Sequence, residues 1–491
     1  MHPADLFTRI ATRHPNSIAI IDNGTPWTYQ KFLQRTGTIA GNLAVGADNR
    51  VLIALPPSVD AYTSIFASLL SGATHTPVNV SAPILKLQNI ASQLDPHAII
   101  AEEPLIAQLG EAAPKARRIV PSKLEGAVDF VDQGYRSDLA YIMFTSGSTG
   151  RPKGMVVPAI ALANYVAWCS VLECKEGDRV SQQPNLGFDI SMTDIFGALC
   201  YGATLVPLVR ELDRLMPARF IKRERITVWN STPSAVSLMM TGRQLTQENL
   251  ASLRLINFCG EALAGDILEA IFQVLPDVIV QNTYGPTEAT VAVTNLRMTK
   301  DSFRPYIRNS VSIGAPIPGM SLHLVGGDAG DEGEIVICGP QLARGYWLDS
   351  ERTDQSFRSL EIEGEVRKGY LTGDWAERHD GNIYFRERLD FQIKVNGYRI
   401  ELDEVAAAIR SFGWPTVATF KRGESIAAIV EKVVGQEFNE DLLKENMRTV
   451  LGRHAVPERI LVVDRVPRND NDKIDRRASS LLADKILSEG D

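Results

Sequence analysis

Thr-Ser-Gly-Ser-Thr-Gly-Arg-Pro-Lys-Gly, at residues 145–154, is the stretch that decides the fold of this chain. It combines hydroxyl side chains, three glycines and two cations, and it contains no apolar side chain. The apolar run at 141–144 predicts a short strand before it, and an apolar segment with a helical pattern follows it. Such a loop can surround a polyphosphate, because glycines let backbone amides approach, hydroxyls donate hydrogen bonds and Lys153 supplies charge.

Two other interpretations of the loop are weaker. The common phosphate-binding loop ends in Gly-Lys-Ser or Gly-Lys-Thr, whereas this one continues through Pro152. A flexible surface linker has a similar composition, but linkers seldom interrupt an apolar strand–helix pattern.

Composition excludes several classes of protein. The 491 residues are enough for roughly two to four domains. Hydrophobic content of 44% and charged content of 22% are typical of a folded, soluble protein. The net charge is −8, and the basic residues are interspersed with acidic ones, so we expect no nucleic-acid partner.

The sequence also predicts a location. No run approaches the ~20 apolar residues that a membrane span needs, and the N-terminus lacks the pattern of a secretory signal. Five widely spaced cysteines show no metal-ligand spacing, which is typical of reduced thiols. We therefore expect a cytoplasmic protein without membrane contact.

The predicted fold class is α/β. Helical patterns such as 60–70 alternate with apolar, strand-like runs at 17–21, 51–55, 97–101, 179–183, 203–207, 226–230, 253–258 and 278–282. From about residue 310 the pattern becomes a glycine-punctuated β pattern. We predict a large N-terminal domain of layered αβ sheets with a β-rich subdomain, at 1–390, and a small, mobile C-terminal α+β domain at 391–491.

A second cluster is Asn282-Thr-Tyr-Gly-Pro-Thr-Glu288, where a strand ends in a Gly-Pro turn. A nucleotide site would use Tyr284 against a base, Thr287 on a phosphate and Glu288 on Mg²⁺, which prefers carboxylate oxygen. A plain β-turn would look similar.

Three further clusters are ambiguous when each is taken alone. Asp374 follows a Gly turn and could accept both hydroxyls of a ribose, but such an Asp is also common in turns. The segment 388–402 contains Gly397 and resembles a hinge or any strand–turn–strand. The run 468–476 could be a solvated surface segment.

Together, the order and spacing of these clusters resemble the adenylate-forming superfamily of acyl-CoA synthetases, luciferases and adenylation domains. The resemblance extends from Trp27 to Lys473. It implies an ATP site in which Glu288 carries Mg²⁺, Asp374 binds the ribose and the loop closes over the β- and γ-phosphates. The ATP-binding residues that it implies are Thr145, Ser146, Gly147, Ser148, Thr149, Gly150, Lys153, Tyr284, Thr287, Asp374 and Arg388.

The resemblance also assigns catalytic positions. Lys473 would reach the α-phosphate and the substrate carboxylate, and Asp390 would be the hinge between the two domains. Lys394 and Gly397 would enter the site for the second half-reaction, with Gly397 along the path of a phosphopantetheine thiol. Asp472 replaces the Gly usual before the catalytic Lys, and a turn tolerates this change.

Four segments, at 228–234, 258–262, 281–294 and 388–394, resemble more narrowly the D-alanine–carrier protein ligases and related small-amino-acid enzymes. The segment 188–196 resembles the signature in which an Asp, here Asp189, pairs with the substrate ammonium. The implied pocket comprises Asp189, Ile190, Thr193, Asn230, Asn257, Cys259, Gly260, Thr283, Val291 and Ala292.

This pocket is more polar than the methyl group of alanine requires. Asn230 and Asn257 could meet a polar substrate side chain, because unpaired buried amides are costly. Alternatively, they could bond to each other or to the backbone.

The expected function is ATP-dependent activation of a small amino acid, followed by transfer to the phosphopantetheine thiol of a carrier protein. The substrate would be alanine in either configuration, or polar like serine, threonine or asparagine. No Gly-Gly-x-Ser-type attachment site follows Lys473, so we expect a separate carrier chain. The alternatives are an acyl- or aryl-CoA ligase, which would have no use for Asp189, and a non-catalytic adenylate-binding scaffold.

Overall fold

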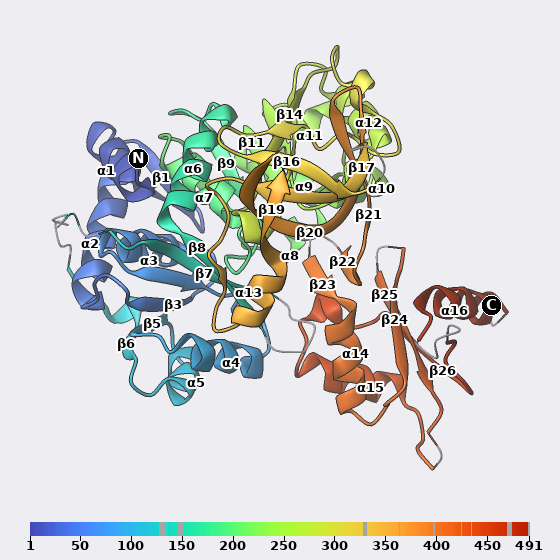
Figure 1. Ribbon diagram of the computed structural model, residues 1–491. Coiled ribbons are helices and arrows are strands. Elements are labelled where there is room, and N and C mark those ends of the chain that lie inside the picture. Colours follow the sequence, from blue (N-terminus) through green and yellow to red (C-terminus); the bar gives the residue numbers. More distant parts are fainter. Residues whose placement is uncertain are drawn as a thin grey trace. The chain divides into compact units, whose positions relative to one another are not determined.

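The computed structural model describes residues 1–126, 134, 136–145, 152–327, 331–362, 364–395, 398–423, 425–433, 435–468 and 474–489. The chain divides into two compact units (Figure 1). The larger unit contains Met1–Val80, Leu94–Phe144 and Gly154–Leu389. The smaller unit contains Ser81–Gln93, Thr145–Lys153 and Asp390–Asp491.

A nine-stranded sheet forms one layer of the larger unit, with the order β15-β14-β13-β12-β11-β9-β10-β1-β2. Neighbouring strands from β13 to β1 are parallel, and antiparallel strands close both edges. The bounds are β1 (Ile18–Asp22), β2 (Thr25–Thr28), β9 (Arg179–Gln182), β10 (Thr204–Pro207), β11 (Val228–Ser231), β12 (Leu255–Phe258), β13 (Ile279–Tyr284), β14 (Thr294–Met298) and β15 (Ala315–Pro316).

A seven-stranded sheet forms a second layer, with the order β18-β8-β7-β4-β3-β5-β6. Its bounds are β3 (Arg50–Ala54), β4 (Thr74–Pro77), β5 (Ala98–Ala101), β6 (Arg117–Ile119), β7 (Leu139–Thr145), β8 (Lys153–Pro158) and β18 (Gly345–Tyr346). All the strands and the helix expected before residue 300 overlap observed elements, so the layered αβ prediction is confirmed. One detail was wrong: the segment 145–154 leads into the strand β8, which begins at Lys153. The helix begins only at Ala159, because the apolar run 155–157 belongs to β8 and pairs with β18.

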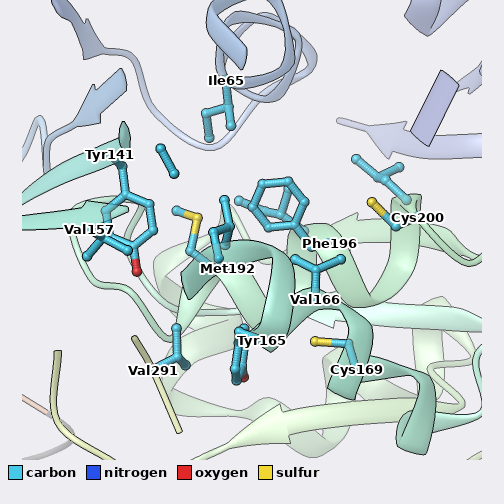
Figure 2. Packing of buried hydrophobic residues seen from close by; sticks show 14 of the residues in the cluster. Ile65, Tyr141, Val157, Tyr165, Val166, Cys169, Met192, Phe196, Cys200 and Val291 are labelled. Carbon is cyan, nitrogen blue, oxygen red and sulfur yellow. The ribbon is translucent and has the colours of Figure 1, made fainter. Parts of the chain in front are cut away.

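Helices between these two sheets form the main core. One buried cluster joins a face of each sheet with side chains of α1, α2, α3, α6 and α7, and Figure 2 shows part of it. Each large apolar side chain buried there contributes about 1.5–3 kcal/mol. A second cluster packs α9, α10 and α12 on the opposite face of the nine-stranded sheet. The α-helices with bounds before residue 360 are α1 (Pro3–Arg13), α2 (Tyr29–Leu43), α3 (Val59–Leu70), α4 (Ile84–Leu94), α5 (Leu105–Ala112), α6 (Ala159–Trp168), α7 (Ser191–Leu199), α8 (Glu211–Leu215), α9 (Pro217–Glu224), α10 (Pro233–Thr241), α11 (Gln247–Leu250), α12 (Gly265–Val274) and α13 (Ser350–Ser356).

The β-rich part of the larger unit is a third, five-stranded sheet built around the long strand β20. Its strands are β16 (Ser321–Gly326), β17 (Glu332–Cys338), β19 (Phe357–Ile362), β20 (Glu365–His379) and β21 (Asn382–Arg388). On the edge of β20 opposite β17, β19 pairs with the first part of the strand and β21 with the last part. The change of partner falls at residues 371–373, where Gly373 has φ +71°, directly before Asp374.

The C-terminal part of the smaller unit is an α+β sandwich. Strands β24 (Val417–Arg422), β25 (Ser425–Glu431) and β26 (Arg459–Val463) form a sheet, and β22 (Gln392–Val395) and β23 (Tyr398–Glu401) form a separate hairpin. Side chains of α14 (Leu402–Ser411) and α15 (Glu440–Arg448) pack on one face of the three-stranded sheet, and α16 (Arg476–Glu489) packs on the other. Within the described ranges, no helix combines the length and the apolar composition that crossing a bilayer requires.

A buried histidine gives the larger unit a testable acid sensitivity. His75 of β4 is fully buried, with its ring 5.7 Å from the ring of Tyr141 on β7. Burial lowers its pKa from 6.5 to about 3, although the backbone of Ala140 acts in the opposite direction. The unfolded chain therefore binds a proton at this side chain below about pH 6.5, where the folded chain does not.

The stability that neutral His75 allows is therefore present above pH 6.5 and is lost as the pH falls towards 3. We expect this side chain alone to lower the free energy of unfolding by up to about 1.4 kcal/mol per pH unit in that window. Urea unfolding of the wild type and of His75→Gln at several pH values from 7 to 4.5 measures the difference. Parallel pH profiles for the two proteins would show that this histidine contributes nothing.

Candidate active site

The carboxyl ends of β11, β12 and β13 bring the predicted substrate residues together. In the parallel register, Asn230 is the partner of Asn257, so both side chains project from the same face of the sheet. That face belongs to the core between the two sheets, where Val228 and Leu255 are buried. Cys259, which follows β12 directly, is buried in the same cluster.

The two asparagines bond to each other. Nδ2 of Asn257 donates to Oδ1 of Asn230 over 3.1 Å, as one of the two sequence alternatives proposed. Among the described residues, Oδ1 of Asn257 is buried and accepts no hydrogen bond. Asn230 also lies beside Asp194 of α7, where burial raises the pKa of the carboxyl well above its usual range, against the lowering effect of the amide.

Helices α6 and α7 supply the opposite wall. Asp189 and Ile190 lie in the turn before α7, where the Asp189 carbonyl accepts from the amide of Met192 at 2.8 Å. Thr193 of α7 and Tyr165 of α6 share a 2.6 Å hydrogen bond between their hydroxyls. Burial, and to a smaller extent the charge of Asp189, raises the pKa of Tyr165 well above its usual range.

The remaining pocket residues lie at the end of β13 or in the segments after β12 and β13. Thr283 of β13 donates to the carbonyl of Phe258 at 2.7 Å, and Gly260 adopts φ +96°. Val291 and Ala292 are buried in the same cluster as Cys259 and Tyr165. Tyr165 was not among the predicted site residues, because the sequence around it shows only an apolar helix pattern.

A second group joins the last residues of β13 and β21 with Asp374 from the middle of β20. The hydroxyl of Tyr284, the last residue of β13, donates to Oδ2 of Asp374 over 2.6 Å. Arg388, the last residue of β21, is the cross-strand partner of Asp374, and its Nη1 lies 2.6 Å from Oδ1. Burial and the neighbouring Asp374 carboxylate raise the pKa of Tyr284 well above its usual range, which keeps this hydroxyl protonated as a donor.

This arrangement suits recognition of a hydroxylated ligand. Asp374 is 6% exposed, and Tyr284 and Arg388 fix the orientation of its carboxylate. A carboxylate held in this way can accept from neighbouring hydroxyl groups, as the two hydroxyls of a ribose would require.

Glu288 lies one residue after Thr287 in the short helix η3 (Thr287–Ala289), and both side chains are buried. Oε1 of Glu288 accepts from the hydroxyl of Tyr346 at 3.0 Å, and its carbonyl accepts from the amide of Ala343 at 2.9 Å. Tyr346 was not among the predicted site residues. Among the described residues, no group of three or more His, Cys, Asp or Glu side chains could hold a metal ion by itself.

In the smaller unit, Lys153, the first residue of β8, forms an ion pair. Its Nζ lies 2.8 Å from Oε1 of Glu401, and that oxygen also accepts from Nε2 of Gln392 at 2.8 Å. Oδ1 of Asp390 accepts from the amide of Gln392 at 3.1 Å. Lys394 lies in β22, opposite Arg399 of β23.

Several predicted site residues lie outside the described ranges. Thr145 is described as the last residue of β7. The residues about which the structure gives no information are Ser146, Gly147, Ser148, Thr149, Gly150, Gly397 and Lys473.

Comparison with known proteins places this site in a family. The profile of the AMP-binding enzyme family matches residues 7–347. The D-alanine–D-alanyl carrier protein ligase of Listeria monocytogenes serotype 4a (strain HCC23) is 30% identical, over 93% of this chain and 94% of that protein. The ligase of the same description from Lacticaseibacillus casei (strain BL23) is 30% identical, over 96% of this chain and 97% of that protein.

A solved structure of an adenylation domain is also similar to this chain in sequence and fold. The Vibrio cholerae adenylation domain AlmE, in complex with glycyl-adenosine-5'-phosphate, is 28% identical, with a TM-score of 0.83 over 98% of each chain. The family match covers well over half of the chain and includes the loop at 145–154, the pair Asn230 and Asn257, and η3. The chain therefore belongs to the AMP-binding enzyme family.

Proposed function

We propose that this enzyme activates a small amino acid with ATP and then transfers the aminoacyl group to the phosphopantetheine thiol of a separate carrier protein in the cytoplasm. One observation carries the proposal. Thr283 and Tyr284 are consecutive at the end of β13, and Thr283 belongs to the pocket beside Asn257 and Cys259 while Tyr284 contacts Asp374. The amino-acid site and the nucleotide site therefore adjoin at one strand end.

The first half-reaction needs no nucleophile from the protein. A carboxylate oxygen of the amino acid attacks the α-phosphorus of ATP, the bond to the bridging oxygen breaks, and pyrophosphate leaves with that electron pair. Two anions must be brought together, so catalysis rests on positioning and charge neutralisation. Lys473 and the loop at 145–154 supply charge, and Asp189 pairs with the substrate ammonium.

The residues present fit one magnesium ion bound together with ATP. Mg²⁺ is usually held by one or two carboxylates, with phosphate oxygens and waters as the other ligands. Glu288, buried and oriented by Tyr346, would provide that carboxylate. The ion would neutralise phosphate charge when bound.

Lys153 must change partner in this scheme. Its ammonium contacts Glu401, and a phosphate oxygen would compete for the same donor hydrogens. Binding of ATP therefore requires that the ion pair open. We place the hinge at Asp390, so that Lys394 and Gly397 serve the thiol-transfer step after Lys473 has left.

The proposed substrate is alanine-sized or slightly larger. The relatives act on D-alanine, and the AlmE complex contains a glycyl adenylate. Among the described residues, Oδ1 of Asn257 and Nδ2 of Asn230 are both buried without a hydrogen-bond partner, which favours a polar substrate side chain such as that of serine, threonine or asparagine. Plain alanine remains the alternative.

Amino-acid-dependent ATP–pyrophosphate exchange over all proteinogenic amino acids, both alanine enantiomers, glycine and a set of fatty and aryl acids tests the proposal. We expect exchange with small amino acids only. Exchange with a fatty or aryl acid, followed by thioester formation on coenzyme A, would identify the acyl-CoA ligase alternative. Nucleotide binding without exchange would identify a scaffold.

A matching assay tests the second half-reaction. Radiolabelled substrate, ATP and a purified phosphopantetheinylated D-alanyl carrier protein should give a labelled carrier. Hydroxylamine should release the label as the aminoacyl hydroxamate, because the bond is a thioester. The apo-carrier, which has no thiol arm, is the control.

A further inference from the structure

Gln341, three residues after β17, is fully buried and reaches across to the segment that carries two pocket residues. Its Nε2 lies 3.3 Å from the carbonyl oxygens of Ala289 and Thr290 and 2.9 Å from that of Ala292. In return, the hydroxyl of Thr290 donates to the carbonyl of Gln341 at 2.7 Å. Gln341 thus binds the segment 289–292 through both its own side chain and its own backbone.

The orientation of the Gln341 amide follows from its neighbours. Three carbonyl oxygens surround one end, so that end must be the NH₂ group, whose two hydrogens are shared among them. At the other end, Oε1 accepts from Nδ2 of Asn164 on α6 at 2.8 Å. Asn164 therefore supports the same orientation of the amide from the other end.

The segment that Gln341 holds has an unfavourable backbone. Thr290 has φ +59° and Val291 has φ +70°, although both residues are β-branched. The amide of Ala292 donates to the carbonyl of Thr290 at 2.9 Å, which is the i→i+2 bond of a classic γ-turn, a rare and strained turn. Such a conformation persists only where the surroundings over-determine it.

Gly285 packs against the backbone of the turn so closely that no side chain would fit there. A Cβ built on Gly285 would lie 2.6 Å from Cα of Ala292 and 2.7 Å from the carbonyl oxygen of Val291. The carbonyl of Tyr284 at the end of β13 accepts from the amide of Val293 at 2.8 Å, which joins the two ends of the segment 285–292. The turn is therefore packed against the strand that joins the two proposed sites.

We propose that Gln341 is a positioning residue that sets the size of the amino-acid pocket by holding the turn at 289–292. Val291 and Ala292 lie in the buried cluster that includes Tyr165 and Cys259, and Figure 2 shows Val291 and Tyr165 within it. Gln341 acts through these residues and not by touching the substrate. The inference rests on the proposed function, because it takes Val291 and Ala292 as the pocket wall.

The test compares three variants in pyrophosphate exchange and in thermal unfolding. In Gln341→Met the shape is nearly kept but the donors are lost, so the turn can relax and the wall moves. We expect the amino-acid KM to rise about tenfold, which a lost buried hydrogen bond of ordinary strength would produce, with the ATP KM within about twofold of wild type. The preference for alanine-sized over larger amino acids should fall by a similar factor.

Asn164→Ala is the second variant, because it leaves the Gln341 side chain in place and removes the donor to its Oε1, together with a longer, 3.4 Å bond to the carbonyl of Pro318. A smaller shift in the same direction is expected, and this variant keeps the test decisive if Gln341→Met does not fold. Tyr29→Phe is the matched control: it also removes a fully buried donor to a carbonyl, that of Ala203 at 2.8 Å, but on α2. It should lower the melting temperature and leave both KM values and the preference unchanged.

The outcomes separate this inference from the proposed function. If Gln341→Met and Asn164→Ala behave like Tyr29→Phe, or raise both KM values together, Gln341 is purely structural and the inference is wrong. If the wild type shows no amino-acid-dependent exchange, the proposed function itself fails.

Discussion

Replacing Lys473 by alanine should slow amino-acid-dependent pyrophosphate exchange by about 10²–10³-fold, the usual cost of losing one preorganised electrostatic stabiliser. The reaction places a substrate carboxylate against the α-phosphate, and a cation at that position offsets the repulsion between the two anions. ATP binding should be nearly unchanged, because the interactions of Asp374, Tyr284 and Arg388 remain. Exchange kinetics and equilibrium binding of ATP measure the two quantities.

Lys432→Ala is the control for Lys473→Ala. Lys432 is an exposed lysine just after β25 in the same unit, so the control removes equal charge without touching the proposed site. Near-normal exchange in Lys473→Ala would remove this lysine from the catalytic assignment. Equal losses in both variants would indicate a general effect of charge.

Asp189→Asn should lower kcat/KM for the amino acid by a hundredfold or more while changing the KM for ATP little. Removing one partner of a buried ion pair costs about 3–5 kcal/mol, because the substrate ammonium is left without a counter-charge. The measurement is exchange with each substrate varied in turn. A change in the amino-acid KM within about twofold would be too small for a lost ion pair and would exclude Asp189 as the ammonium partner.

Asp194→Asn gives a matched control within the same helix region. Asp194 is fully buried, and because burial raises its pKa well above the usual range, its neutral form is favoured. The amide keeps the size of the carboxyl, and Asp194 is not the proposed ammonium partner, so the effect on amino-acid use should be far smaller. A loss as large as that of Asp189→Asn would mean that the proposed ammonium partner has been assigned to the wrong carboxylate.

Local sequence was sufficient for the element types. The apolar runs at 179–183 and 278–282 predicted strands, and 60–70 predicted a helix, because alternation and helical periodicity depend only on neighbouring residues. The segment after the 145–154 loop shows the limit of that reasoning. The run 155–157 is apolar enough for a helix or a strand, and pairing with β18 decides that it is a strand.

By itself, the sequence determined the family, and it predicted the site residues: the loop at 145–154, Glu288, Asp374 and the signature around Asp189. The residues of each such motif are contiguous in sequence, so the motif can be recognised without knowledge of the fold.

Only the tertiary structure decided which side chains meet. Sheet register pairs Asn257 with Asn230, so that one amide donates to the other. The change of partner along β20 brings Asp374 to Arg388 and Tyr284. The amide of Gln341 meets the strained turn at Val291 only because the segment after β17 folds against the segment before β14, and no local pattern encodes that contact.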